Sequence, residues 1–291
     1  MGSKLNFTVL KHKVALVRAK YQDFRIYDLG SYAVNHLVSQ SSYTAEFDLC
    51  YGTAARQVLD LYHAKQPRQG RPLIVFVHGG AWSHGDKKDY RFVAEAFTKH
   101  GYNVAILNYQ LAPKHIFPTS VDDLSLALNY LHAQQHALHI STEQWVLMGH
   151  SAGAFNVMSA LYHAQPYALA CRAQIRAVIG LAGPYHFDYK DDPLCADAFD
   201  QSLHYSHVMP YYFVEFSQTK HYLFVAKNDT IVHPKNALDF DQALKAQGNH
   251  SEIIVVPRTG HISLMGSVSS LFSRYFSTKK QILAALEQAL A

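Results

Sequence analysis

The sequence has few cysteines, no apolar run of membrane length and no block of like charge. Its 291 residues include three cysteines, Cys50, Cys171 and Cys195. An odd number at wide spacing does not support a disulfide framework, so we interpret them as reduced thiols of a cytoplasmic protein. No apolar stretch approaches the roughly 20 residues that a membrane helix needs. We therefore expect no membrane span.

The charge is also modest. The formal net charge is +4 with neutral histidine, and the basic residues are scattered, so we expect no nucleic-acid partner. The first residues, MGSKLNFTVLKHK, contain only a short apolar stretch interrupted by polar residues and do not resemble a signal peptide. Two histidine pairs have spacings that suit a metal, but both lack flanking cysteine or acidic ligands. We expect neither a metal nor an organic cofactor; the pairs are His132 with His136 and His204 with His207.

Short apolar or β-branched runs alternate along the chain with longer segments of helical pattern. Several runs are apolar on both faces, which is typical of parallel strands covered by helices. Alternation of this kind predicts an α/β fold with a mostly parallel central sheet flanked by helices. The predicted strands are 58–64, 73–79, 103–109, 145–151, 177–183, 222–228 and 252–258.

Capping residues predict where the helices begin and end. One helix should start near Asp89 and stop at Gly101, and another should have Thr119 or Ser120 as its N-cap. Residues 184–218 are rich in aromatic side chains and lack a clear strand, so we expect a small cap-like insertion there. We expect residues 1–291 to form a single domain, with the poorly patterned residues 1–40 and the insertion 184–218 over the active site.

The stretch VLMGHSAGAF places Ser151 between two glycines, directly after an apolar run. A sharp turn from strand to helix imposes strained backbone dihedrals on its central residue. Small residues two positions before and after, here Gly149 and Gly153, let the strand and helix approach each other. The serine hydroxyl would then stand above the carboxyl edge of the sheet, at the positive end of the next helix.

A serine hydroxyl is a weak nucleophile and needs a base that is itself oriented by an acid. On this type of sheet the partners follow in the order serine, acid, histidine. Asp229 follows a late strand and His261 follows the next one, so we assign them as acid and base to Ser151. The alternatives are weaker: His233 lies too close behind the acid, and Asp239 and Asp241 lie in a predicted helix and should face solvent.

A tetrahedral intermediate also needs backbone N–H donors for its oxyanion. One donor should be Ala152, the residue after the nucleophile. The sequence HGGAW follows an earlier predicted strand, and its Gly79 and Gly80 can turn their N–H groups into the site. These three N–H groups are the predicted oxyanion hole.

Taken together, these motifs resemble the α/β-hydrolase superfamily, and within it the hormone-sensitive-lipase-like esterases and their kynurenine-formamidase-like relatives. The resemblance runs from about Val58 to His261 and rests on HGGAW, GDKKDY, NYQLAPKHIFPTSVDD, GHSAG, KNDTIVHP and GHISL. It implies an α/β-hydrolase fold and the same roles for Ser151, Asp229 and His261. It likewise implies the same oxyanion donors, Gly79, Gly80 and Ala152.

The chain departs from the family pattern at two positions. Gln110 stands where arginine is usual, and Ala81 stands where the lipase-like branch often has a third glycine. Ala81 followed by Trp82 favours the formamidase and feruloyl-esterase-like side. The departure at Ala81 bears on the sub-branch and the substrate and leaves the hydrolytic chemistry unchanged.

The sequence thus predicts a serine hydrolase that cleaves small carboxylic esters. An arylformamidase with the same triad is the closest alternative, and a non-catalytic binding protein with the hydrolase fold is a more remote one. Three aromatic residues are candidates for a substrate pocket, although aromatic residues of the insertion could instead pack it against the core. The candidates are Trp82, Tyr185 and Phe187.

Overall fold

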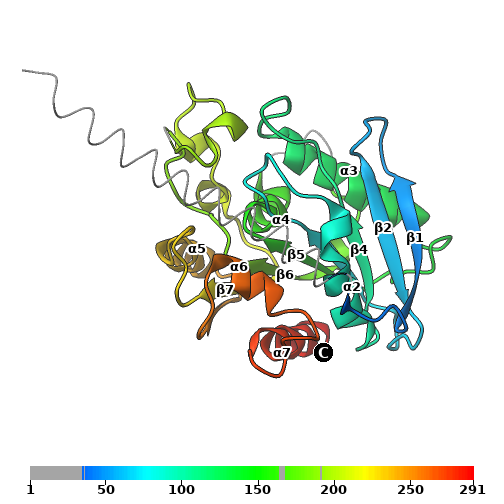
Figure 1. Ribbon diagram of the computed structural model, residues 1–291. Helices are drawn as coiled ribbons and strands as arrows, with labels where there is room; N and C mark the ends of the chain where they lie inside the picture. Colours follow the sequence, from blue (N-terminus) through cyan, green and yellow to red (C-terminus); the bar gives the residue numbers. More distant parts are fainter. Residues whose placement is uncertain (1–34, 36, 164–167, 191) are drawn as a thin grey trace, which may run out of the picture.

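An eight-stranded sheet forms the centre of the protein, in a computed structural model that describes residues 35, 37–163, 168–190 and 192–291. The strand order is β1-β2-β4-β3-β5-β6-β7-β8. β1 and β2 pair antiparallel at one edge, β2 pairs antiparallel with β4, and all later pairs are parallel (Figure 1). The strands are β1 (Tyr43–Cys50), β2 (Val58–Ala64), β3 (Leu73–Val77), β4 (Asn103–Leu107), β5 (Trp145–His150), β6 (Ile175–Leu181), β7 (Lys220–Ala226) and β8 (Ser251–Val256).

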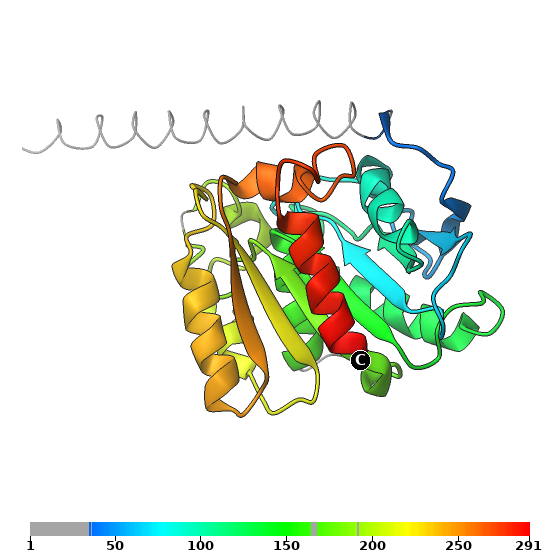
Figure 2. The same ribbon diagram turned by 90° about the horizontal axis from the view of Figure 1, so that it is seen from below.

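Helices cover both faces of this sheet, because the central strands are apolar on both sides. In β3, Val75 faces one hydrophobic layer, whereas Ile74 and Phe76 face the other. The first layer is completed by α3 (Thr119–Gln134), α4 (Ala152–Tyr162) and α5 (Lys235–Ala246). The second is completed by α2 (Arg91–Thr98), α6 (His261–Gly266) and α7 (Thr278–Leu290), and Figure 2 shows α7 in front of the sheet.

The prediction from hydrophobic pattern missed one strand. In β1 (Tyr43–Cys50), polar residues are interspersed among apolar ones, and the strand is largely exposed. Its register with β2 is irregular between Glu46 and Leu49. An edge strand buries little apolar surface, so it gives no apolar run to recognise. Pairing with β2 defines it, and this contact is not visible in the local sequence.

Two predicted helix starts also need correction. The helix expected near Asp89 is preceded by a 3₁₀ turn, η1 (Lys87–Tyr90), which Asp86 caps with its side chain, and α2 follows it. Neither Thr119 nor Ser120 is an N-cap, because α3 begins at Thr119 and Pro118 occupies the cap position. Proline has a fixed φ that suits the start of a helix, so it can stand there without a side-chain cap.

The insertion 184–218 has no strand in its described residues and contains three 3₁₀ turns, η3 (Ala196–Ala198), η4 (Tyr205–His207) and η5 (Pro210–Phe213). The prediction about residues 1–40 concerns mainly residues 1–34, which lie outside the described residues. That residues 1–291 form one domain also stays a prediction. Across the described part of the chain, no helix combines the length and the apolar character required to cross a membrane.

Candidate active site

Ser151 occupies the turn between β5 and α4 at the carboxyl edge of the sheet. Its φ and ψ are 53° and −121°, a region that non-glycine residues rarely adopt, so the turn is strained. The Ser151 amide donates to the Leu181 carbonyl oxygen at 2.9 Å, which connects the turn to the end of β6. Small neighbours are necessary, since a Cβ on Gly149 would lie 2.2 Å from the Gly153 carbonyl oxygen.

The side chains of Ser151, His261 and Asp229 form a hydrogen-bonded chain. Ser151 Oγ lies 2.9 Å from His261 Nε2, and His261 Nδ1 lies 2.9 Å from Asp229 Oδ2. A carboxylate can only accept, so Nδ1 carries the proton of the neutral imidazole and Nε2 accepts from the serine. The side chains of His261 and Asp229 are 3% and 2% exposed, which keeps both bonds away from water.

The Asp229 carboxylate remains charged despite its burial. Burial acts to raise its pKa, but the bond and charge of His261 and two backbone N–H groups outweigh burial and lower it. Asp229 Oδ1 accepts from the amides of Ile231 and Val232, both at 2.9 Å. The charged carboxylate can therefore orient His261 and stabilise its protonated form.

The segment 78–86, which we call the glycine loop, lies against the serine. A Cβ on Gly79 would be 3.1 Å from Ser151 Cβ, so the Gly79 backbone touches the nucleophile. Gly80 has a φ of 123°, and its carbonyl oxygen accepts from the amides of Ser83 and His84 at 3.0 and 2.9 Å. Ala152 begins α4, where helix N–H groups have no acceptor within the helix.

The three pocket candidates are mostly packed inside the protein. Tyr185 is fully buried and stacks on Phe240 of α5 with ring centroids 4.7 Å apart, so this candidate is corrected to a core residue. Trp82 is 5% exposed, and its indole Nε1 donates to Asn156 Oδ1 at 3.0 Å. Phe187 is only half-buried, and it remains available at the surface.

Aromatic contacts connect the insertion to the glycine loop. Phe199 of the insertion meets the Trp82 ring edge-on, with centroids 4.7 Å apart, and it also contacts Phe155 of α4. The insertion therefore packs beside the segment that adjoins Ser151. Whether it covers the site stays a prediction.

The prediction that Asp239 and Asp241 face solvent is wrong. Asp239 accepts from His186 Nδ1 at 2.6 Å and also pairs with Lys235, and Asp241 is 8% exposed and pairs with Lys245. Basic partners allow both carboxylates to be partly or largely buried on α5. His233 is exposed and accepts from the Lys235 amide.

His150 contributes to the site, although nothing in the sequence pattern singles it out. Its Nε2 lies 3.1 Å from the His261 carbonyl oxygen, and the two rings are 4.9 Å apart. Burial lowers the His150 pKa to about 3, so the ring is neutral and donates to that carbonyl. The position before the nucleophile can hold many residue types. Only the contact with the His261 carbonyl oxygen shows that His150 supports the site.

Because three histidines are buried, we expect the protein to lose stability in acid. Burial lowers the pKa of His78 and His221 to about 4 and that of His150 to about 3, from an ordinary 6.5. Between about pH 6.5 and 4, the unfolded chain binds protons that the folded chain excludes, so stability falls as pH falls. Each group should contribute a loss of about 2 kcal/mol between pH 7 and 5.

Urea unfolding at pH 7 and pH 5 measures this loss. In the variant His221→Gln the decrease in unfolding free energy should be smaller than in the wild type by about 2 kcal/mol. His221 lies on β7, away from the glycine loop and the turn at Ser151, so the change in pH dependence reports on this imidazole and not on the proposed site. Equal pH dependence of variant and wild type would contradict the prediction.

Comparison with known proteins identifies a family and several relatives of this chain. A family model described as BD-FAE matches residues 59–244. The chain is 31% identical over 146 residues to a probable isoprenylcysteine alpha-carbonyl methylesterase, ICME, of Oryza sativa subsp. japonica, covering 47% of this chain and 35% of that protein. It is 28% identical over 137 residues to a kynurenine formamidase of Drosophila melanogaster, covering 47% of this chain and 45% of that protein.

The chain therefore spans between a third and a half of the length of these two curated relatives. The structure is similar to that of esterase B from Lactobacillus rhamnosis (HN001), with a TM-score of 0.76, 17% identity, and coverage of 96% of this chain and 95% of that chain. At this identity the likeness concerns the fold. The predicted α/β-hydrolase fold is confirmed.

Proposed function

The chain belongs to the BD-FAE family, and we propose that it is a serine hydrolase that cleaves small carboxylic esters. One observation carries the proposal: Ser151 Oγ, His261 and Asp229 form a continuous hydrogen-bonded chain with both distances at 2.9 Å. The three residues follow three different strands, β5, β8 and β7. Such a chain supports activation of a serine for attack on a carbonyl.

The proposed reaction has two stages. His261 Nε2 takes the Ser151 proton while Oγ attacks the ester carbonyl, and the same proton then passes to the departing alcohol. This leaves an acyl group on Oγ. Water, deprotonated by His261, attacks the acyl carbonyl, and His261 returns the proton to Ser151 Oγ as the acid leaves. Asp229 stays ionised throughout and stabilises the imidazolium that forms in each stage.

The oxyanion of each tetrahedral intermediate would be bound by the N–H groups of Gly79, Gly80 and Ala152. Gly79 supports this role because its backbone adjoins Ser151. Ala152 supports it because the first turn of a helix presents N–H groups and the positive end of the helix dipole. In other enzymes, removal of one such donor costs about 3 kcal/mol of transition-state stabilisation.

An arylformamidase activity is the second candidate. It is favoured by the similarity to a kynurenine formamidase, 28% identical over 137 residues, and by Ala81-Trp82 in place of further glycine. Cleavage of an N-formyl amide would use the same serine, base and oxyanion donors.

The cytoplasmic location predicted from the cysteines stays a prediction.

Rates on two substrates distinguish these candidates. We expect the purified protein to hydrolyse p-nitrophenyl acetate with a higher kcat/KM than N-formylkynurenine, because an ester has a better leaving group than an amide and needs less help from the site. Release of nitrophenolate and of formate measures the two rates. A preference of many orders for N-formylkynurenine would replace the esterase with the formamidase, and inactivity on both would favour a binding protein.

A further inference from the structure

The glycine loop has an unfavourable backbone conformation over several residues. The φ angles of Gly80, Ala81, Trp82 and Gly85 are 123°, 48°, 58° and 99°. Two of these residues carry side chains, and positive φ is costly for them. Such a conformation persists only where surrounding contacts hold it. The loop that adjoins Ser151 therefore depends on its neighbours for its shape.

Gly85, near the end of the loop, packs directly on its start. A Cβ on Gly85 would lie 2.7 Å from the Gly79 carbonyl oxygen and 2.5 Å from His78 Nδ1. His78 Nδ1 itself donates to the Gly79 carbonyl oxygen at 2.7 Å. A displacement of Gly85 would consequently be transmitted to the Gly79–Gly80 peptide, whose N–H is a proposed oxyanion donor.

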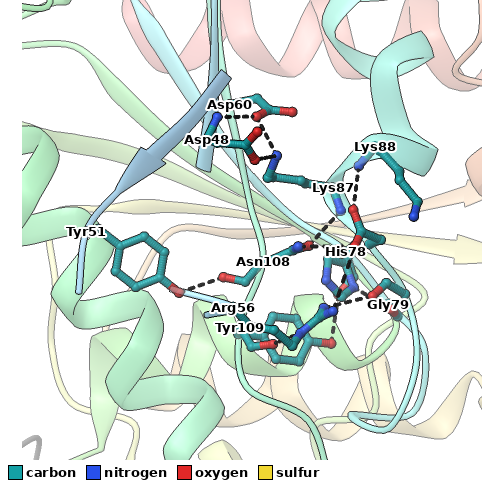
Figure 3. A network of polar contacts seen from close by, with 12 residues as sticks. Asp48, Tyr51, Arg56, Asp60, His78, Gly79, Lys87, Lys88, Asn108 and Tyr109 are labelled. Carbon is teal, nitrogen blue, oxygen red and sulfur yellow. Dashed lines mark hydrogen bonds and ion pairs between the residues drawn. The ribbon is translucent and has the colours of Figure 1, made fainter. Parts of the chain in front are cut away.

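One guanidinium group holds both ends of this arrangement (Figure 3). Arg56 Nη2 donates to the Gly85 carbonyl oxygen at 2.8 Å, and Arg56 Nε donates to the Tyr109 carbonyl oxygen at 2.7 Å. The Tyr109 hydroxyl in turn donates to the His78 carbonyl oxygen at 3.2 Å. The donors of a guanidinium are fixed in one plane, so Arg56 sets the position of Gly85 relative to Tyr109 and the start of the loop.

The segment beyond Gly85 is fixed by a second set of contacts in the same view. Asn108 Oδ1 accepts from the Lys87 amide at 2.7 Å, and Asn108 Nδ2 donates to Asp86 Oδ2 at 3.3 Å. Lys87 Nζ donates to the carboxylate of Asp60 on β2. These bonds connect the end of the loop to the sheet. Arg56 acts at the same end, because it donates to the Gly85 carbonyl oxygen and its Nη1 lies 3.8 Å from Asp86 Oδ2.

We propose that Arg56 is a positioning residue that aligns the oxyanion donors of Gly79 and Gly80 through Gly85, without touching the substrate. The inference rests on the proposed hydrolase function. Arg56 lies between β1 and β2, its side chain is 29% exposed, and it lines a surface cavity of about 450 Å³ together with Asp48, Lys87 and Arg91. A small cation from solvent can therefore reach the place of its guanidinium.

Kinetics of Arg56→Ala and Arg56→Lys on p-nitrophenyl acetate test this role. Misaligned oxyanion donors weaken transition-state binding more than substrate binding. We expect Arg56→Ala to lower kcat about tenfold to a hundredfold, below the full effect of removing a donor, with KM nearly unchanged. Arg56→Lys should fall between, since an ammonium can replace only part of the fork.

Chemical rescue and a matched control separate positioning from stability. Millimolar guanidinium, well below denaturing concentrations, should restore part of the kcat of Arg56→Ala, because the ion fits the vacated fork. Arg68→Ala is the control. Arg68 precedes β3, pairs with Glu287 and lies away from Ser151. The kcat of this variant should equal that of the wild type with or without guanidinium.

Each other outcome overturns the inference. If the wild type hydrolyses the ester and Arg56→Ala matches Arg68→Ala, the hydrolase proposal stands and the positioning role is wrong. If Arg56→Ala loses activity only in proportion to its unfolded fraction, and guanidinium restores none, Arg56 contributes to stability alone. If the wild type is inactive on esters and formamides, both proposals fail together, because no oxyanion forms.

Discussion

Ser151→Ala is expected to lower kcat/KM on p-nitrophenyl acetate by about 10⁴-fold or more. The substitution removes the nucleophile, so no acyl-enzyme can form. Alanine is nearly isosteric with serine and meets the same strain at φ 53°, and the variant should therefore fold as the wild type does. The residual rate would come from the oxyanion donors and substrate binding, which remain.

A fluorophosphonate probe gives a second readout of the same variant. Serine attack on phosphorus with loss of fluoride labels an activated hydroxyl, so the wild type should be labelled at Ser151 and Ser151→Ala should not be. Ser159→Ala is the matched control: Ser159 lies on α4, is fully buried, and its hydroxyl has no hydrogen-bond partner among the described residues. It should keep wild-type activity and labelling.

Retained activity in Ser151→Ala would remove the serine from the mechanism. Equal losses in Ser151→Ala and Ser159→Ala would attribute the effect to the packing of α4 instead. Only a loss confined to Ser151 agrees with the proposed chemistry.

The largest expected effect on stability belongs to Gly153→Ala. A Cβ at this position would lie 2.1 Å from the Val77 carbonyl oxygen and 2.6 Å from that of His78. Both are backbone atoms at the end of the central strand β3, so relief requires moving α4 away from the sheet. We expect a loss of about 3 kcal/mol or more in the free energy of unfolding, measured by urea denaturation.

Gly266→Ala provides the control for this glycine. Gly266 is the last residue of α6, and a Cβ there would meet nothing within 4 Å. Alanine favours a helix over glycine by up to about 1 kcal/mol, so this variant should be as stable as the wild type or slightly more so. If Gly153→Ala were as stable as Gly266→Ala, the close approach of helix and strand would not be a constraint.

The inner strands and the turn at Ser151 were predictable because their signals are local. The strand predicted at 73–79 begins where β3 (Leu73–Val77) begins, and β3 is buried throughout, since buried parallel strands carry continuous apolar runs. The need for Gly149 is local, because a Cβ there would lie 2.2 Å from the carbonyl oxygen of Gly153, four residues along the chain. Chain order also selected His261 among 19 histidines.

Contacts between distant segments were not predictable in the same way. Tyr185 was a pocket candidate by residue type, yet a Cβ on Gly180 would lie 1.8 Å from its hydroxyl oxygen, so this ring fills the space beside β6. Arg56 looks like an ordinary loop arginine until the fold brings the Gly85 carbonyl within 2.8 Å. β1 becomes a strand through its pairing with β2.

From the amino-acid order alone one can predict the alternation of strands and helices, the turn at Ser151 and the order of serine, acid and histidine, because periodicity and steric size act over short stretches of chain. Which side chains meet at the carboxyl edge depends on how the strands are ordered in the folded chain. The sheet order β3-β5-β6-β7-β8 places loops from separate parts of the chain side by side. Hydrogen bonds and close packing act over a few ångströms, and only the folded chain brings those loops within that range.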